Sequence, residues 1–226
     1  MQQIEKNSVS SKNQLKKDSY VTFIQEGGKG KRVIFVGNSI TRHGVLPEIG
    51  WLQDWGMAAS SIEKDYVHLL VKKINNIEPE ASFCVCQVAT WERNYKNGSE
   101  YLQSYESARA FEADVIVMRM IENCPVNDFD EELFYYEYKN LIEYLNPEQK
   151  AKLVLTTGFW KHPGDDTVMR IAKELGCPCI YMGELGEDDK MKAIGLFEHE
   201  GIANHPGDRG MECIADMIWK KIKDII

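Results

Sequence analysis

The sequence predicts an α/β domain in which a parallel sheet carries helices on both faces. Short runs of β-branched and aromatic residues alternate with segments whose apolar residues recur every three or four positions, along most of the 226 residues. This alternation is the pattern of right-handed βαβ units, which build a parallel sheet. No repeat or linker interrupts it, so we expect one domain over residues 21–226, preceded by a flexible tail over residues 1–20.

The clearest predicted strand ends at Gly37, after the apolar run Val-Ile-Phe-Val that begins at residue 33. Four further runs have the length and composition of parallel strands, at residues 82–89, 114–120, 152–157 and 178–182. Residues 20–24 form a candidate edge strand. Helical periodicity predicts helices over residues 57–76, 101–111, 129–145, 167–175 and 207–226.

Composition and charge disfavour nucleic acid and metal ions as partners, and also a membrane span. The formal net charge is −8 and the pI is near 5.2, which disfavours binding to nucleic acid because no basic stripe could neutralise phosphates. The six cysteines include the pairs Cys84/Cys86 and Cys177/Cys179, whose spacing within apolar runs indicates buried side chains and not zinc ligands. We expect no metal, a reducing compartment and, since no apolar stretch occurs in residues 1–20, a cytoplasmic protein without a membrane span. Export stays open if the natural chain begins upstream.

Ser39 directly follows the first predicted strand, in the sequence Gly37-Asn-Ser-Ile-Thr41. Ligands of open α/β sheets bind at the carboxyl ends of the strands, so a hydroxyl there faces a candidate site. The alternative is that Ser39 caps a turn or a helix. Thr90 and Asn123 also follow strand ends, and we therefore expect them at the same edge as Ser39.

A serine hydroxyl becomes a useful nucleophile only when a base accepts its proton. His205 precedes the last predicted helix in Asn204-His-Pro-Gly-Asp-Arg-Gly210 and is the candidate base, although for a His-Pro pair taken alone a capping loop is the favoured explanation. Asn123 is a candidate donor to an oxyanion, with a turn or helix cap as the alternative role.

Three blocks of this sequence resemble those of the SGNH/GDSL hydrolases. Gly37-Asn-Ser-Ile-Thr41 looks like the nucleophile block, Ile121-Glu-Asn123 like the asparagine block and His205-Pro-Gly-Asp208 like the histidine block. The resemblance covers residues 31–226. It implies a three-layer α/β/α sandwich, flavodoxin-like, with about five parallel strands, and esterase or lipase chemistry without a metal or organic cofactor. It also implies Ser39 as nucleophile, His205 as general base, and an oxyanion hole formed by Asn123 and the Ser39 amide.

The sequence departs from the family pattern at three places that precede the histidine block. Asn38 stands where the family usually has aspartate. The family also has a glycine after the second strand, whose amide contributes to the oxyanion hole. That glycine is not evident in this chain, and the amide of Ala89 or Thr90 is the candidate replacement. Ile121 occupies the place of a glycine two positions before the asparagine.

The largest departure concerns the third member of the triad. The family has an acid three residues before the histidine, and this chain has Ile202 there. We therefore expect a Ser39–His205 dyad. A backbone carbonyl is one candidate for orienting the imidazole, and Glu198, Glu200 and Asp208 are the side-chain alternatives.

Residues around these loops are candidates for contact with substrate: Asn38, Trp55, Trp91 and Trp160. The tryptophans could stack on a sugar or an acyl chain, and packing in the core is the alternative for each. The sequence thus favours a serine esterase acting on a small acyl ester, most plausibly an O-acetyl group on a carbohydrate. A thioesterase or lysophospholipase with the same machinery is an alternative, and so is a catalytically silent carbohydrate- or lipid-binding module. The oligomeric state is open.

Overall fold

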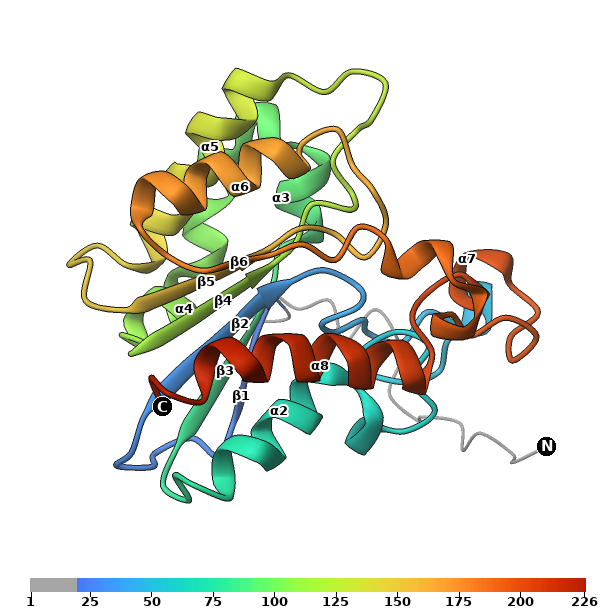
Figure 1. Ribbon diagram of the computed structural model, residues 1–226, viewed down its shortest axis with the longest axis horizontal. Helices are drawn as coiled ribbons and strands as arrows, with labels where there is room; N and C mark the ends of the chain where they lie inside the picture. Colours follow the sequence, from blue (N-terminus) through green and yellow to red (C-terminus); the bar gives the residue numbers. More distant parts are fainter. Residues whose placement is uncertain (1–19) are drawn as a thin grey trace.

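The computed structural model describes residues 20–226, and Figure 1 shows a central sheet with helices on both faces. The sheet has six strands in the order β1-β3-β2-β4-β5-β6. Their bounds are Val21–Ile24 (β1), Arg32–Gly37 (β2), Ser82–Gln87 (β3), Val115–Arg119 (β4), Lys152–Thr156 (β5) and Cys179–Ile180 (β6). Except for Tyr20, the predicted tail lies outside the described residues.

Five of the strands are parallel, and β1 pairs antiparallel with β3 at the edge. The parallel part runs β3-β2-β4-β5-β6, which is the flavodoxin-like order, so the predicted fold class is confirmed. In this order the chain changes direction across the sheet between β2 and β4. Ligands of doubly wound sheets bind beside that switch point, at the carboxyl ends of the strands. Ser39 follows β2 and Asn123 follows β4.

The helical segments of the described chain are as follows: 3₁₀ turns at Pro47–Ile49 and Ile62–Lys64, α2 (Tyr66–Asn75), α3 (Ala89–Arg93), a 3₁₀ segment at Tyr95–Tyr105, α4 (Glu106–Ala110), α5 (Glu131–Leu145), α6 (Asp165–Leu175), 3₁₀ turns at Leu185–Glu187 and Asp189–Met191, α7 (Glu200–Ala203) and α8 (Asp208–Ile222).

Each face of the sheet is covered by its own set of helices (Figure 1). On one face, strand side chains such as Ile34 and Met118 pack against α3, α4, α5 and α6. On the other, Phe35 and Val117 pack against α2 and α8. Because successive strand residues point to opposite faces, a strand buried on both sides reads as a continuous apolar run, which is why these strands were visible in the sequence.

Several predicted elements differ in extent from the observed ones, among them the following three. The predicted helix over residues 57–76 begins only at Tyr66, because the Asp65 side chain accepts a hydrogen bond from the His68 amide at 2.7 Å and caps the helix there. The predicted helix over residues 101–111 is largely 3₁₀, with α4 limited to Glu106–Ala110. The last predicted strand, residues 178–182, shortens to Cys179–Ile180 at the sheet edge. Within the described chain, no helix is long and apolar enough to cross a membrane.

Candidate active site

The turn after β2 presents Ser39 at the switch point of the sheet. The amides of Thr41 and Arg42 both donate to the Asn38 carbonyl, at 2.9 and 3.0 Å, and close the turn. No side chain fits at Gly37, the last residue of β2, since a Cβ at this position would lie 1.9 Å from Thr41 Oγ1 and 2.5 Å from the Arg119 carbonyl oxygen. The glycine therefore allows the tight turn that lifts the serine out of the sheet.

Ser39 and His205, which are 166 positions apart in the sequence, are hydrogen-bonded. Ser39 Oγ lies 2.8 Å from His205 Nε2, and His205 Nδ1 lies 2.6 Å from the Gly201 carbonyl oxygen. A carbonyl oxygen only accepts, so Nδ1 carries the ring proton and Nε2 of the neutral imidazole is free to accept from the serine hydroxyl. This is the tautomer that a general base for Ser39 requires.

The Gly201 carbonyl is available because of the way the short helix α7 ends. The Asn204 amide donates to Glu200 and the His205 amide donates to Ile202, so neither of these amides uses the Gly201 oxygen. Carbonyls in the last turn of a helix lack partners from the helix itself, and a nearby histidine can satisfy one. The backbone carbonyl is thus the group that holds the imidazole.

None of the side chains considered as orienting acids takes this place. Ile202 is buried with Trp51 and Ala193 in a small apolar cluster. Asp208 accepts from the Ser60 amide and hydroxyl and from Lys64, each within 2.8 Å. Glu198 and Glu200 are exposed.

Burial lowers the pKa of His205 to about 4. The charges of His43 and Arg119 lower this pKa further, whereas the Gly201 carbonyl and Glu122 raise it. Without a carboxylate on Nδ1, little opposes the cost of burying an imidazolium. His205 is therefore neutral, and able to accept a proton, across the whole neutral range of pH.

Asn123 lies in the loop after β4, and its side-chain amide is held at both ends. Asn123 Nδ2 donates to Glu92 Oε2 at 2.5 Å, and Arg93 Nη2 donates to Asn123 Oδ1 at 3.4 Å. Thr90 is the second residue of α3, after β3. The amide of Ala89 already donates to Gln87 Oε1 at 3.1 Å, which leaves Thr90 as the better of the two candidates for an oxyanion donor.

A buried cluster of charged and polar side chains lies directly below this loop, and sequence reasoning missed it. Glu92, Arg119 and Asn38 have no exposed surface, and the Glu122 side chain is 7% exposed. Asn38 Nδ2 donates to Glu92 Oε1 at 3.0 Å and to Glu122 Oε2 at 2.5 Å, and Arg119 pairs with Glu122. Asn38 therefore joins two carboxylates inside the protein, and its predicted contact with substrate is wrong.

The two carboxylates have opposite electrostatic environments. Burial raises the pKa of Glu92 to about 7, and the neighbouring charge of Glu122 raises it too. Burial also opposes the ionisation of Glu122, but the Arg119 guanidinium and the Phe159 amide hold the pKa of Glu122 below its usual value. One signal in the sequence could have revealed this cluster: Arg119 is a charged residue inside an otherwise apolar central strand.

Ile121 adopts the backbone conformation that a glycine would be expected to occupy. Its φ is 138°, in the region that β-branched residues rarely adopt. The Ile121 amide donates to Glu92 Oε1 at 2.5 Å, and the isoleucine side chain is fully buried. These two contacts hold a strained residue in place of the glycine expected from the family pattern.

The predicted tryptophans have three different positions. The Trp160 ring packs edge-on against His205, with 5.6 Å between ring centroids, so it does lie beside the dyad. Trp55 is half-buried, packs on Trp51 and donates its indole N–H to Ala59. Trp91 has no exposed surface and packs against Phe134 and Tyr138 in the core, so its predicted contact with substrate is wrong and the core-packing alternative is correct.

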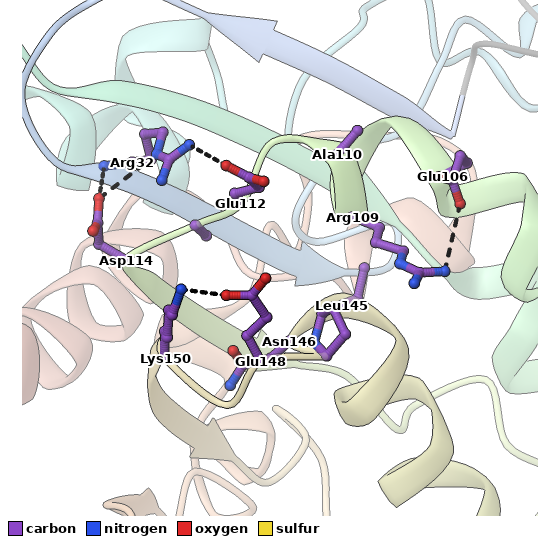
Figure 2. A pocket seen from close by; sticks show the side chains of 12 residues that line it. Arg32, Glu106, Arg109, Ala110, Glu112, Asp114, Leu145, Asn146, Glu148 and Lys150 are labelled. Carbon is purple, nitrogen blue, oxygen red and sulfur yellow. Dashed lines mark hydrogen bonds and ion pairs between the residues drawn. The ribbon is translucent and has the colours of Figure 1, made fainter.

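A separate pocket of about 530 Å³ opens at the opposite, amino edge of the sheet (Figure 2). Arg32 lies 3.3 Å from Glu112, Arg109 lies 3.9 Å from Glu106, and Lys150 pairs with Glu148. Each cation in this pocket already has a carboxylate partner. The arrangement resembles a solvated surface more than a ligand site.

Several solved structures have a fold similar to that of this chain. A two-domain esterase (CEX) active on acetylated mannans aligns with a TM-score of 0.57 at 19% identity, over 86% of this chain and 49% of that chain. The psychrotrophic esterase EstA from Pseudoalteromonas sp. aligns with a TM-score of 0.56 at 12% identity, over 86% of this chain and 97% of that one. A protein assigned to the G-D-S-L lipolytic family, from Desulfitobacterium hafniense, gives a TM-score of 0.51 at 13% identity, covering 84% and 98% of the two chains.

These similarities show that the chain has the fold of the GDSL/SGNH esterases, as the sequence blocks predicted. The chain spans about half the length of the two-domain mannan esterase. No family model matches the sequence, and no curated protein matches it.

Proposed function

We propose that this protein is a serine esterase that removes small acyl groups, specifically O-acetyl groups, from a carbohydrate. The observation that carries the proposal is the hydrogen-bonded relay from Ser39 Oγ to His205 Nε2, and from His205 Nδ1 to the Gly201 carbonyl. A nucleophile, a base of the right tautomer and a group that orients the base are the three parts that acyl transfer to serine needs.

The proposed reaction uses the two residues in turn. Ser39 Oγ attacks the acyl carbonyl carbon while its proton passes to His205 Nε2. The tetrahedral intermediate collapses, the alcohol oxygen of the sugar takes the proton from Nε2 as it leaves, and the acyl group stays on Ser39. Water then attacks the acyl carbon while His205 Nε2 accepts a proton from that water. As the bond from this carbon to Ser39 Oγ breaks, Nε2 returns the proton to Oγ, which restores the serine hydroxyl and releases the acid.

The negative oxygen that forms in each step needs donors in place beforehand. We assign this role to the Ser39 amide, to one hydrogen of Asn123 Nδ2 and to the Thr90 amide. Asn123 Nδ2 has two hydrogens, and Glu92 accepts only one of them, so the other is free to donate to an oxyanion.

The absence of a carboxylate on Nδ1 does not by itself argue against catalysis. When the aspartate of a serine protease triad is replaced by its amide, about 10⁴ in kcat is lost, and the cause is the wrong tautomer. Here the Gly201 carbonyl fixes the right tautomer. The cost that remains is weaker stabilisation of the imidazolium, because a carbonyl dipole replaces a full negative charge.

The choice of an acetylated carbohydrate rests on two supports. One structural neighbour is an esterase active on acetylated mannans, and another is a family two carbohydrate esterase from Cellvibrio japonicus, with a TM-score of 0.50 at 13% identity over 88% of this chain and 62% of that one. The second support is Trp160, whose ring lies beside His205, where it could stack on a sugar.

Rates of hydrolysis with p-nitrophenyl acetate, p-nitrophenyl octanoate and acetylated oligosaccharides test the proposal. We expect the acetyl esters to be hydrolysed fastest, and we expect kcat/KM to fall at least about 10⁴-fold in Ser39→Ala and in His205→Ala. Fastest turnover of the octanoate, or of a thioester or lysophospholipid included in the same series, would replace the acetyl assignment. Hydrolysis that survives both substitutions would contradict the dyad, and no hydrolysis at all would favour a silent binding module.

A further inference from the structure

Glu92 is a fully buried carboxylate that the dyad chemistry does not use. It belongs to α3, which follows β3, and three hydrogen bonds converge on it. Glu92 Oε1 accepts from Asn38 Nδ2 at 3.0 Å and from the Ile121 amide at 2.5 Å, and Oε2 accepts from Asn123 Nδ2 at 2.5 Å. Two of these three donors belong to the loop that carries the proposed oxyanion donor.

The next residue, Arg93, holds the other end of the same amide. Glu92 accepts from the nitrogen of Asn123, and Arg93 donates to its oxygen at 3.4 Å. If the amide turned over, its oxygen would face a carboxylate and its nitrogen would face a guanidinium. Both contacts would be repulsive, so the pair allows a single orientation of Asn123.

The backbone of the loop depends on Glu92 as well. Ile121, two residues before Asn123, has a φ of 138°, and the Glu92 carboxylate accepts its amide hydrogen. A strained conformation persists only where its surroundings hold it. Glu92 therefore contacts both the side chain of Asn123 and the backbone that leads to it.

We propose that Glu92, assisted by Arg93, is the positioning residue that aims the free hydrogen of Asn123 Nδ2 at the oxyanion. This inference rests on the proposed function, because Asn123 has an oxyanion to bind only if Ser39 performs acyl transfer. Glu92 itself stays buried and touches neither the substrate nor the dyad. In this proposal its effect on the rate passes through Asn123, although the hydrogen bond from Asn38 also links Glu92 to the residue next to Ser39.

The charge around Glu92 makes this contact dependent on pH. Together, Glu92, Glu122 and Arg119 carry one net negative charge when all three are ionised, and burial with the Glu122 charge raises the pKa of Glu92 to about 7. Both carboxylate oxygens of Glu92 accept hydrogen bonds, so a proton on either oxygen would compete with one of these donors and weaken the hold on the loop that carries Asn123. Five titratable groups of the described chain interact electrostatically with Glu92: Glu122, Arg119, Cys124, Tyr105 and Tyr138.

The sign of the pH effect follows from these groups. The carboxylate that orients Asn123 is lost as the pH falls through the pKa of Glu92, whereas His205, with its pKa of about 4, stays neutral. We therefore expect kcat to fall on the acid side in two steps. The first step belongs to Glu92, near pH 7, and the second belongs to His205, near pH 4.

The test measures kcat, KM and the pH profile of ester hydrolysis in Glu92→Gln, Asn123→Ala and the double variant. Glutamine offers an N–H₂ group in place of one carboxylate oxygen, and it does not titrate. We expect Glu92→Gln to lower kcat about 10- to 100-fold with little change in KM, because the donor acts in the transition state. We expect it to abolish the step near pH 7 and to have no further effect when Asn123 is already alanine.

The same loss of kcat in both backgrounds would overturn the inference, because it would show that Glu92 acts independently of Asn123. Persistence of the upper acid step in Glu92→Gln would also overturn it. Failure of the proposed function looks different: hydrolysis would then survive Ser39→Ala, whatever the effect of Glu92→Gln.

Arg93→Ala keeps the test decisive if Glu92→Gln does not fold. Arg93 is exposed, so its removal leaves the core intact. We expect about a 3- to 10-fold loss of kcat, the size expected from one exposed charged hydrogen bond. This loss should vanish in the Asn123→Ala background. An unchanged kcat in Arg93→Ala, or an equal loss in both backgrounds, would contradict the proposal.

Asn146→Ala is the matched control for a loss of stability alone. Asn146 is buried at the amino edge of the sheet and makes two hydrogen bonds with Ala151. This variant should have a lower Tm but an unchanged kcat and pH profile. A change in its pH profile of the kind predicted for Glu92→Gln would count against a specific role for Glu92.

Discussion

The two edges of the sheet carry charge in different ways. At the amino edge, three cations pair with carboxylates in a pocket open to solvent: Arg32, Arg109 and Lys150. At the carboxyl edge, three charged side chains are buried beneath the Ser39 loop: Arg119, Glu92 and Glu122. The side chains of Lys150 and Glu148 are 79% and 66% exposed, and those of Arg119 and Glu122 are 0% and 7% exposed. Exposed pairs contribute about 0–1 kcal/mol, while loss of one partner from a buried pair costs about 3–5 kcal/mol. Of these two described pairs, the buried Arg119–Glu122 pair at the carboxyl edge is thus the costly one to disrupt, and the exposed Lys150–Glu148 pair at the amino edge is not.

The backbone differs between the edges in the kind of strain. Glu112 and Gln149 at the amino edge have φ of 49° and 51°, in the left-handed helical region, whereas Ile121 at the carboxyl edge has a φ of 138°. Crowded glycines occur at both edges, Gly28 at the amino edge and Gly37 at the carboxyl edge. Strain and buried charge cost stability, and proteins keep them mainly where a geometry has to be held. The predictions below ask whether that difference between the edges is functional.

Outside the Ser39–His205 dyad, the largest effect should come from Asn123→Ala. Loss of one donor from an oxyanion hole typically lowers kcat by about 10²–10³-fold. We expect a loss of this size with KM little changed, measured with p-nitrophenyl acetate. A loss confined to KM would mean that Asn123 binds the substrate in its ground state and not the oxyanion.

Gly37→Ala should have the next largest effect. The new Cβ would meet Thr41 Oγ1 and the Arg119 carbonyl, so the turn that carries Ser39 has to shift. Displacement of a reacting atom by about 1 Å can cost about 10²-fold in rate, and we expect a loss of kcat of that order. Gly176→Ala, at the end of α6, is the control. Nothing lies within 4 Å of the new Cβ, but the φ of 63° is unfavourable for alanine, so this variant should have a lower Tm and an unchanged kcat. An active Gly37→Ala with normal kinetics would show that the turn tolerates the side chain.

Ile202→Asp restores the acid of the family pattern at its usual sequence position, but we expect it to impair the protein. Ile202 is buried with Trp51 and Ala193, and the Gly201 carbonyl already accepts from His205 Nδ1. Burial of a carboxyl there should lower the free energy of unfolding by about 3 kcal/mol, without an increase in kcat.

The loss in Ile202→Asp should grow as the pH rises. A carboxyl in an apolar cluster stays protonated in the folded chain, whereas it ionises in the unfolded one. Ile202→Val is the control, with an expected loss of about 1 kcal/mol at every pH. Thermal unfolding between pH 5 and pH 8 distinguishes the two variants. A gain in kcat for Ile202→Asp would show that a side chain at this position does reach His205.

The smallest effect should come from the amino edge. Lys150→Ala removes an exposed ion pair with Glu148, and we expect a change in the free energy of unfolding below about 1 kcal/mol with no change in kcat. A large loss of activity would mean that the pocket in Figure 2 has a role in the reaction.

The fold and the two residues of the dyad could be predicted from the sequence, and the reason is physical. Buried parallel strands leave continuous apolar runs, and strand-end loops converge on one edge, so Ser39 and His205 could be paired without coordinates. The orienting group could not be read in this way, because the Gly201 carbonyl is a backbone atom and any residue carries one. Its availability depends on how α7 ends.

The buried carboxylates were missed for a different reason. Glu92 and Glu122 occur among polar residues after strand ends, where a charged side chain usually faces solvent. Only the packing of α3 under the loop after β4 brings Glu92 against Ile121 and Asn123. Trp91 shows the converse, since its place just after the end of a predicted strand suggested the site, while its side chain packs in the core.

Covalent labelling of Ser39 tests the central claim most directly. The protein is treated with a fluorophosphonate, its intact mass is measured, and the modified peptide is identified. The account predicts one label per chain, on Ser39, with no labelling of Ser39→Ala and much slower labelling of His205→Ala. A label on another residue, or equal labelling of the wild type and Ser39→Ala, would contradict it.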